Sequence, residues 1–182
     1  MLSVGKISAG RGGYYLEAVA QGREDYYTQA GEVPGRWLGA GADSLGLSGA
    51  VMDAAFVAVL AGVDPQTGAA LGRANRRVSA FDLTLSAPKS VSLLWALGQE
   101  RSSDAVVAAH EAAVDAALGW LERTAVWSRA GHNGVEEIRG DGLVAAAFRH
   151  RTSRAGDPQV HTHVVVANAT PTSISVGGRN WY

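Results

Sequence analysis

The chain has 182 residues, 47% of them hydrophobic, and a formal net charge of −1, which together favour one domain with a sizeable core. Because the charge is nearly balanced, any binding of nucleic acid must depend on local basic patches. The absence of cysteine excludes disulfides, thiolate metal sites and a cysteine nucleophile, and is compatible with a reducing cytoplasm. No signal-peptide core and no run of roughly twenty apolar residues is present, so we expect a soluble protein.

The first part of the chain is rich in glycine and carries two tyrosine pairs. Residues Leu2–Ile7 are predicted to form a short strand that ends in a glycine-rich turn. The pairs are Tyr14-Tyr15 and Tyr26-Tyr27, and such pairs alone indicate packing more often than chemistry. The next predicted elements are a long ordered loop over Gly31–Gly49, a helix capped by Ser48 and ending near Leu60, and a loop over Gly62–Arg77 that ends in a basic run.

The segment Ala80–Ser86 alternates like a strand, with Phe81, Leu83 and Leu85 on its apolar face. Asp82 lies on the other face, although aspartate is disfavoured within strands. Either that face is solvated, or Asp82 meets a cation, a metal ligand or a nucleophile. The elements predicted after this strand are a helix over Ala87–Leu97 with Ser86 as N-cap, a long amphipathic helix over Ser103–Arg123 containing a structural His110, a strand over Ala125–Ala130 and a turn at the surface residue His132.

A hairpin with three histidines is the strongest feature of the sequence. Gly142–His150 and Gln159–Asn168 are predicted strands, joined by a loop that contains Gly, Asp and Pro. Because side chains alternate along a strand, His161 and His163 share a face, and an antiparallel return can bring His150 beside them. Three imidazoles that converge from two strands predict a metal site with part of the coordination sphere open.

The assembled prediction is an α+β fold with an antiparallel sheet of about five strands. The strands lie near the N-terminus and at Ala80–Ser86, Ala125–Ala130, Gly142–His150 and Gln159–Asn168, with two main helices packed on one face. The other face is predicted to carry Asp82 and the three histidines.

Three blocks, in order, resemble a known family: the early Tyr-Tyr pair, FDLTLSAPKSVS and FRHRTSRAGDPQVHTH. They are similar to the relaxase domain of MobF-class conjugative plasmid relaxases, which are HUH (His-hydrophobe-His) endonucleases, although the middle residue here is Thr162. The resemblance covers nearly all of the chain and implies the palm-like HUH relaxase fold. Family members continue beyond this length, so residues 1–182 resemble a relaxase domain truncated at its C-terminus.

The resemblance implies a nickase and strand transferase that cuts single-stranded DNA at a plasmid transfer origin and forms a 5′-phosphotyrosine intermediate. Tyr14 is similar to the principal nucleophile and Tyr26 to the second catalytic tyrosine, while Tyr15 and Tyr27 match their neighbours. The remaining residues that it implies are Asp82 as the acidic residue and His150, His161 and His163 as the ligands of a divalent metal ion.

The family resemblance implies Mg or Mn in the cell, whereas three imidazoles suit Mn, Zn, Ni or Fe. The implied partners are single-stranded origin DNA with an adjacent hairpin, relaxosome accessory proteins and the conjugative coupling protein. The implied state is a monomer in the bacterial cytoplasm without membrane insertion. The basic residues predicted to contact DNA are Arg149, Arg151, Arg154, Lys89, Arg76 and Arg77.

Three other classes share parts of this pattern. A rolling-circle replication initiator uses the same His and Tyr chemistry, but the tyrosine pairs and the block order favour a relaxase. A cupin-type oxygenase adds a Glu ligand a few residues after its His pair, and Val164–Ala169 supplies no carboxylate. A noncatalytic DNA-binding module would form no covalent adduct with DNA.

Overall fold

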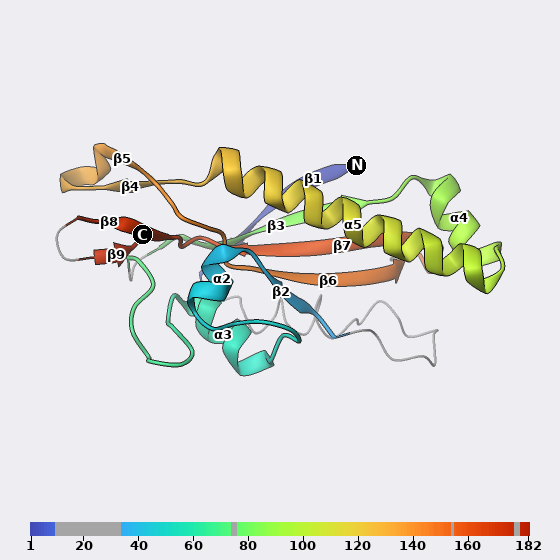
Figure 1. Cartoon of the computed structure of the whole chain (residues 1–182), viewed down its shortest axis with the longest axis horizontal. Coiled ribbons are helices and arrows are strands. Elements are labelled where there is room, and N and C mark those ends of the chain that lie inside the picture. The colour runs from blue at the N-terminus through green and yellow to red at the C-terminus, as the bar shows by residue number, and fades with distance from the viewer. Residues whose placement is uncertain (10–33, 74–75, 154, 177–178) are drawn as a thin grey trace.

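The protein is described by a computed structural model over residues 1–9, 34–73, 76–153, 155–176 and 179–182. It has the predicted α+β fold, with a five-stranded antiparallel sheet between a long helix on one side and two shorter helices on the other (Figure 1). The strands of this sheet, from edge to edge, are β1 (Leu2–Ser8), β3 (Val78–Ser86), β7 (Pro158–Ala167), β6 (Ala145–Thr152) and β2 (Arg36–Leu38).

The central hairpin of β6 and β7 matches the prediction closely. In its register Ala146 faces Val165 and His150 faces His161. Gly156, with a φ of 79°, helps the chain to reverse in the turn, because glycine adopts a positive φ without steric cost. The other central pair joins β3 to β7, so both sides of β7 are hydrogen-bonded.

The fifth strand is not the predicted one. Ala125–Ala130 was expected in the main sheet, but β4 (Trp127–Ala130) pairs with β5 (Glu136–Arg139) in a separate two-stranded sheet. Its place is taken by β2, which lies inside the predicted loop Gly31–Gly49 and has Trp37 opposite Ala146. Three residues are too short for a recognisable alternation, so tertiary pairing defines this strand. The other two-stranded sheet joins β8 (Pro171–Val176) and β9 (Arg179–Trp181).

One face of the main sheet packs against α4 (Lys89–Leu97) and α5 (Glu100–Ala125). The predicted Ser86 cap of α4 is wrong, because the chain stays extended through Pro88, and the helix begins at Lys89 without a side-chain cap. On α5 the buried side chains are spaced four apart: Val106, His110, Val114 and Leu118. Val114 and Leu118 pack with Val164 and Val166 of β7 and with Ala145 and Ala147 of β6. The small alanines let the helix approach the sheet closely.

The opposite face of the sheet carries two shorter helices and the histidines. One half is covered by α3 (Asp53–Ala61) and α2 (Ala40–Ser44), which lie on the other side of the sheet from α5 (Figure 1). Phe56 of α3 is 1% exposed and meets Phe148 edge-on, with ring centroids 5.2 Å apart. The helix begins at Asp53, so the predicted cap at Ser48 is also wrong. The histidines lie on the other half of this face, where His150 and His161 are buried.

His110 is buried between α5 and β7, as the structural role predicted for it requires. Its Nε2 is 2.9 Å from the hydroxyl of Thr162. Burial lowers the pKa of His110, and the Arg149 guanidinium and the N-terminal ammonium lower it further, against the opposing Glu111 carboxylate. The folded protein therefore holds His110 in the neutral form over a pH range in which the unfolded chain binds a proton.

We expect His110 to make the folded state less stable in acid. Between its lowered pKa and the ordinary value near 6.5, the unfolded state binds more protons, so the free energy of unfolding falls as the pH drops through this window. Urea unfolding of metal-free protein at several pH values between 7.5 and 5.5 measures the effect. His110→Gln should lose less stability over this range, whereas parallel profiles for the two proteins would contradict the assignment.

Among the residues that the structure describes, no helix is both long enough and apolar enough to cross a membrane. The predicted surface residue His132 is exposed in a short 3-10 helix, His132–Gly134.

Candidate metal centre

Three imidazoles gather on the sheet face that α5 does not cover. His150 and His161 are paired across β6 and β7, and His163 is two residues further along β7. The ring centroids are 5.2 Å apart for His150 and His161, 5.4 Å for His150 and His163, and 5.2 Å for His161 and His163. The predicted histidine cluster is therefore formed by two strands that are both fixed within the sheet.

These separations fit a shared metal ion. Imidazoles that bind one tetrahedral ion through nitrogens at about 2.1 Å have centroids about 5 Å apart. Among the described residues, no group of three or more His, Asp or Glu side chains is arranged so that it could hold a metal ion as it stands. The strands fix the ring centroids, and small rotations of the imidazoles would redirect their nitrogens without moving the strands. The donor set fits a divalent ion that accepts nitrogen ligands.

Hydrogen bonds select which nitrogen each ring on β7 presents. His161 Nδ1 lies 2.9 Å from the carbonyl oxygen of Gln159, and His163 Nδ1 lies 2.8 Å from Asp82 Oδ2. A carbonyl and an ionised carboxylate can only accept, so both Nδ1 atoms carry the proton and donate. Nε2 then keeps the lone pair, and it is the nitrogen that each ring would offer to a metal.

Asp82 is placed beside the cluster by the β3–β7 register. Its carboxylate contacts His163 Nδ1 through both oxygens, at 2.8 and 3.0 Å, and both side chains are less than one-fifth exposed. Thr84, two residues further along the same strand face, has its hydroxyl 3.3 Å from the same nitrogen. Asp82 therefore orients the His163 ring, and a carboxylate in this position would make the ring a stronger donor to a metal. The sequence showed Thr84 on the polar face of the strand, but gave it no role.

The predicted DNA-binding residues are spread over the molecule. Arg149 projects from the α5 face, where its guanidinium is 2.5 Å from Glu111, so it lies behind the histidines and not beside them. Arg76 donates to the carbonyl of Asn168 at 2.6 Å, and with the exposed Arg77 it lies near the end of β7 away from His161. Lys89 donates to the carbonyl of Pro158, at the end of β7 nearest the histidines.

Arg151 lies close to α4, with its guanidinium carbon 5.9 Å from the centre of the Trp95 ring. The predicted catalytic tyrosines Tyr14, Tyr15, Tyr26 and Tyr27 lie outside the described residues, and so does Arg154.

A five-stranded antiparallel sheet with three histidines and a carboxylate on one face is the arrangement expected for a relaxase domain. The family model described as TrwC relaxase matches residues 9–178. The chain belongs to the TrwC relaxase family. It is 40% identical to two multifunctional conjugation proteins TraI of Escherichia coli, one of them from strain K12, over 92% and 93% of this chain. These matches span only 9% and 10% of the TraI proteins.

Solved structures of the conjugative relaxase TrwC agree in fold. In a metal-bound complex with oriT DNA, the TrwC chain is 35% identical to this chain and superposes with a TM-score of 0.77. The match covers 100% of this chain and 60% of the TrwC chain. A copper-bound complex is also 35% identical, with a TM-score of 0.78 over 95% of this chain and 59% of that one. A third complex contains a 27-mer DNA with the recognition hairpin and the cleavage site, at 33% identity and a TM-score of 0.75, over 95% of this chain and 57% of that one.

Proposed function

We propose that this chain is the DNA-nicking and strand-transfer part of a conjugative relaxase. It would cut one strand of a transfer-origin DNA and remain joined to the new 5′ end through a tyrosine. The observation that carries the proposal is the cluster of His150, His161 and His163 with Asp82 on one sheet face, in a chain of the TrwC relaxase family. The metal-bound DNA complexes of TrwC support it.

The proposed reaction exchanges one phosphoester for another. The phenol of Tyr14 gives up its proton as its oxygen attacks the scissile phosphorus, the bond from phosphorus to the 3′ oxygen breaks, and that oxygen takes up a proton and leaves as a 3′-hydroxyl, so the number of protons is conserved overall. A divalent ion held by the three histidines would stabilise negative charge on the phosphate. Asp82 keeps His163 in the tautomer that binds the ion. Because one phosphoester is exchanged for another and none is hydrolysed, the reverse reaction at the same site can rejoin the strand without energy from a nucleotide such as ATP.

Several finer statements belong to the proposal. We propose Mn²⁺ as the working ion, because it accepts imidazole ligands more readily than Mg²⁺ does. The DNA would be single-stranded at the cut and carry an adjacent hairpin; the DNA in the TrwC complex comprises a recognition hairpin and the cleavage site. Relaxosome proteins, a coupling protein, a monomeric state and the assignment of residues 1–182 to one relaxase domain stay predictions of the family resemblance.

The test uses origin oligonucleotides with a hairpin and a candidate cleavage site, labelled at either end. With Mn²⁺, a 3′ label should move to a protein-sized band on a denaturing gel, while a 5′ label should appear on a shorter strand that ends in a 3′-hydroxyl. EDTA should prevent both. Binding of the DNA without any adduct, over the whole panel and with Mn²⁺, Mg²⁺ and Zn²⁺, would instead assign the chain as a noncatalytic DNA-binding module.

The positions of two cations predict different effects on DNA binding. Lys89 is exposed and donates to a neutral carbonyl, whereas the charge of Arg149 is compensated by Glu111. We expect Lys89→Gln to flatten the slope of log affinity against log salt by about 0.7, the loss of one phosphate contact on single-stranded DNA. Arg149→Gln should leave the slope unchanged. A change of slope in Arg149→Gln alone would restore the original prediction that Arg149 contacts phosphate.

A further inference from the structure

Two buried rows of side chains face each other between α5 and the sheet, and each row has one polar exception. On α5 the row is Val106, His110, Val114 and Leu118. On β7 the residues that point towards the helix alternate with the histidines, and they are Val160, Thr162, Val164 and Val166. A valine or leucine would satisfy the apolar pattern at both exceptions, so packing alone does not explain a histidine and a threonine there.

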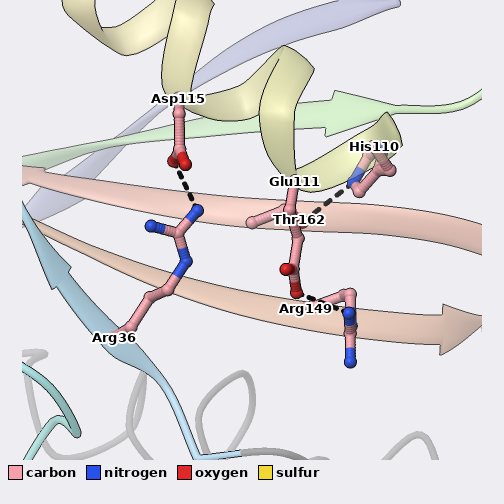
Figure 2. Close-up of polar contacts among 6 residues, drawn as sticks. All are labelled: Arg36, His110, Glu111, Asp115, Arg149 and Thr162. Carbon is pink, nitrogen blue, oxygen red and sulfur yellow. Dashed lines mark hydrogen bonds and ion pairs between the residues drawn. The ribbon is translucent and has the colours of Figure 1, made fainter. Parts of the chain in front are cut away.

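The two exceptions meet. Figure 2 shows His110 reaching down from α5 to Thr162, where His110 Nε2 and Thr162 Oγ1 are 2.9 Å apart. Thr162 is 4% exposed and His110 is 9% exposed, so water does not replace this contact. Burial lowers the pKa of His110 and keeps its ring neutral, and a neutral imidazole nitrogen can form one hydrogen bond with a hydroxyl.

Thr162 lies between His161 and His163 in the sequence. Its side chain points to α5, and the two histidine side chains point to the opposite face, so all three move together with one short segment of β7. Hydrophobic contact is non-directional, whereas a hydrogen bond fixes a distance and an angle. A metal site tolerates displacements of its ligands of only about 0.5 Å. A hydrogen bond on the α5 side of this segment therefore affects the positions of both His161 and His163.

The paired strand is held from the same helix. Glu111, the neighbour of His110, forms an ion pair with Arg149, which is opposite Thr162 in the β6–β7 register and precedes His150 (Figure 2). Asp115, one turn further along α5, pairs with Arg36 of β2. Successive polar residues of α5 thus hold β7, β6 and β2, and the first two of these strands carry all three histidines.

We propose that His110 and Thr162 are positioning residues, which set the histidine hairpin on α5 so that His150, His161 and His163 converge on one metal ion. This inference rests on the proposed function of the metal centre. It also gives a physical reason for a threonine at the middle of His161-Thr162-His163, where a hydrophobic residue would pack but could not form the bond.

The test makes two measurements on each variant. Calorimetric titration of Mn²⁺ into the protein gives the metal affinity, and thermal unfolding gives the melting temperature. Thr162→Val keeps the shape of the side chain and removes the hydroxyl, and should weaken Mn²⁺ binding about tenfold. Thr162→Ser keeps the hydroxyl and should retain the wild-type affinity. Val114→Ala is the matched control, because it loosens the same interface beside the bond without removing a polar contact. It should lower the melting temperature and leave the affinity unchanged.

The double variant His110→Leu/Thr162→Val replaces the polar pair by an apolar one, and it covers the case in which Thr162→Val alone does not fold. We expect it to regain stability but to keep the tenfold weaker affinity. Wild-type Mn²⁺ affinity in this double variant would show that the pair only packs, and so would equal losses of affinity in Val114→Ala and Thr162→Val. Either result would overturn the positioning role of His110 and Thr162 and leave the proposed metal centre standing. Absence of Mn²⁺ binding by the wild-type protein would overturn the metal centre as well.

Discussion

His163→Ala is expected to weaken Mn²⁺ binding by at least about 100-fold. Removing a residue that hydrogen-bonds to a ligand lowers metal affinity by about 10- to 100-fold, and removing the ligand itself lowers it further. It removes one of three imidazoles and also leaves Asp82 without the ring that it orients. Covalent adduct formation with origin DNA should fall with the metal affinity. Calorimetric titration and the denaturing gel measure the two losses separately, and His161→Ala should behave in the same way.

The chain offers a matched control for this prediction. His132 is an exposed histidine in the 3-10 helix before β5, so His132→Ala removes one imidazole without touching the cluster. It should keep the wild-type affinity and the wild-type adduct yield. If His161→Ala and His163→Ala both bound Mn²⁺ as tightly as the wild type, the metal site would have to be placed elsewhere, whatever happened to cleavage.

The hairpin and its face were predictable because they depend on local rules. Alternation along Gln159–Asn168 places His161 and His163 on one face, and antiparallel return brings His150 opposite His161. The same rule placed Asp82 on the polar face of its strand, and the register then set it beside His163. The structure shows that this carboxylate contacts His163. Metal binding by His163 and the role of Asp82 in it stay proposals.

The elements that were missed depend on contacts between distant parts of the chain. β2 is a strand only because three residues pair with β6, and its sequence alone reads as a loop. Arg149 was predicted to contact phosphate because it belongs to a local basic patch at the end of a predicted strand. In the structure it points towards α5 and pairs with Glu111, and its contact with DNA stays a prediction. The identity of the strand next to β6 and the partner of the half-buried Arg149 are set by tertiary contacts, which propensity and pattern do not encode.

Tyr14→Phe is expected to reduce the covalent adduct to below about 1% of the wild-type yield, because the variant keeps the aromatic ring and loses only the hydroxyl that attacks phosphorus. Metal affinity should stay unchanged, since the three histidines are untouched. This combination separates Tyr14 from His163, whose replacement lowers both quantities. It also separates chemistry from folding, because a variant that fails to fold would lose the metal site too.

The second tyrosine pair supplies the comparison. Tyr26→Phe should still form the first adduct, because Tyr26 is proposed to act in a later strand transfer, and Tyr15→Phe should cleave as the wild type does. Mass spectrometry of the wild-type adduct should place the phosphotyrosine at Tyr14, which is joined through the phosphate to the 5′ end of the cleaved strand. If Tyr14→Phe formed the adduct at normal yield, now mapped to Tyr15 or Tyr26, the nucleophile would be reassigned. The histidine cluster and its support by Asp82 would stand, since both depend on the sheet and not on the tyrosines.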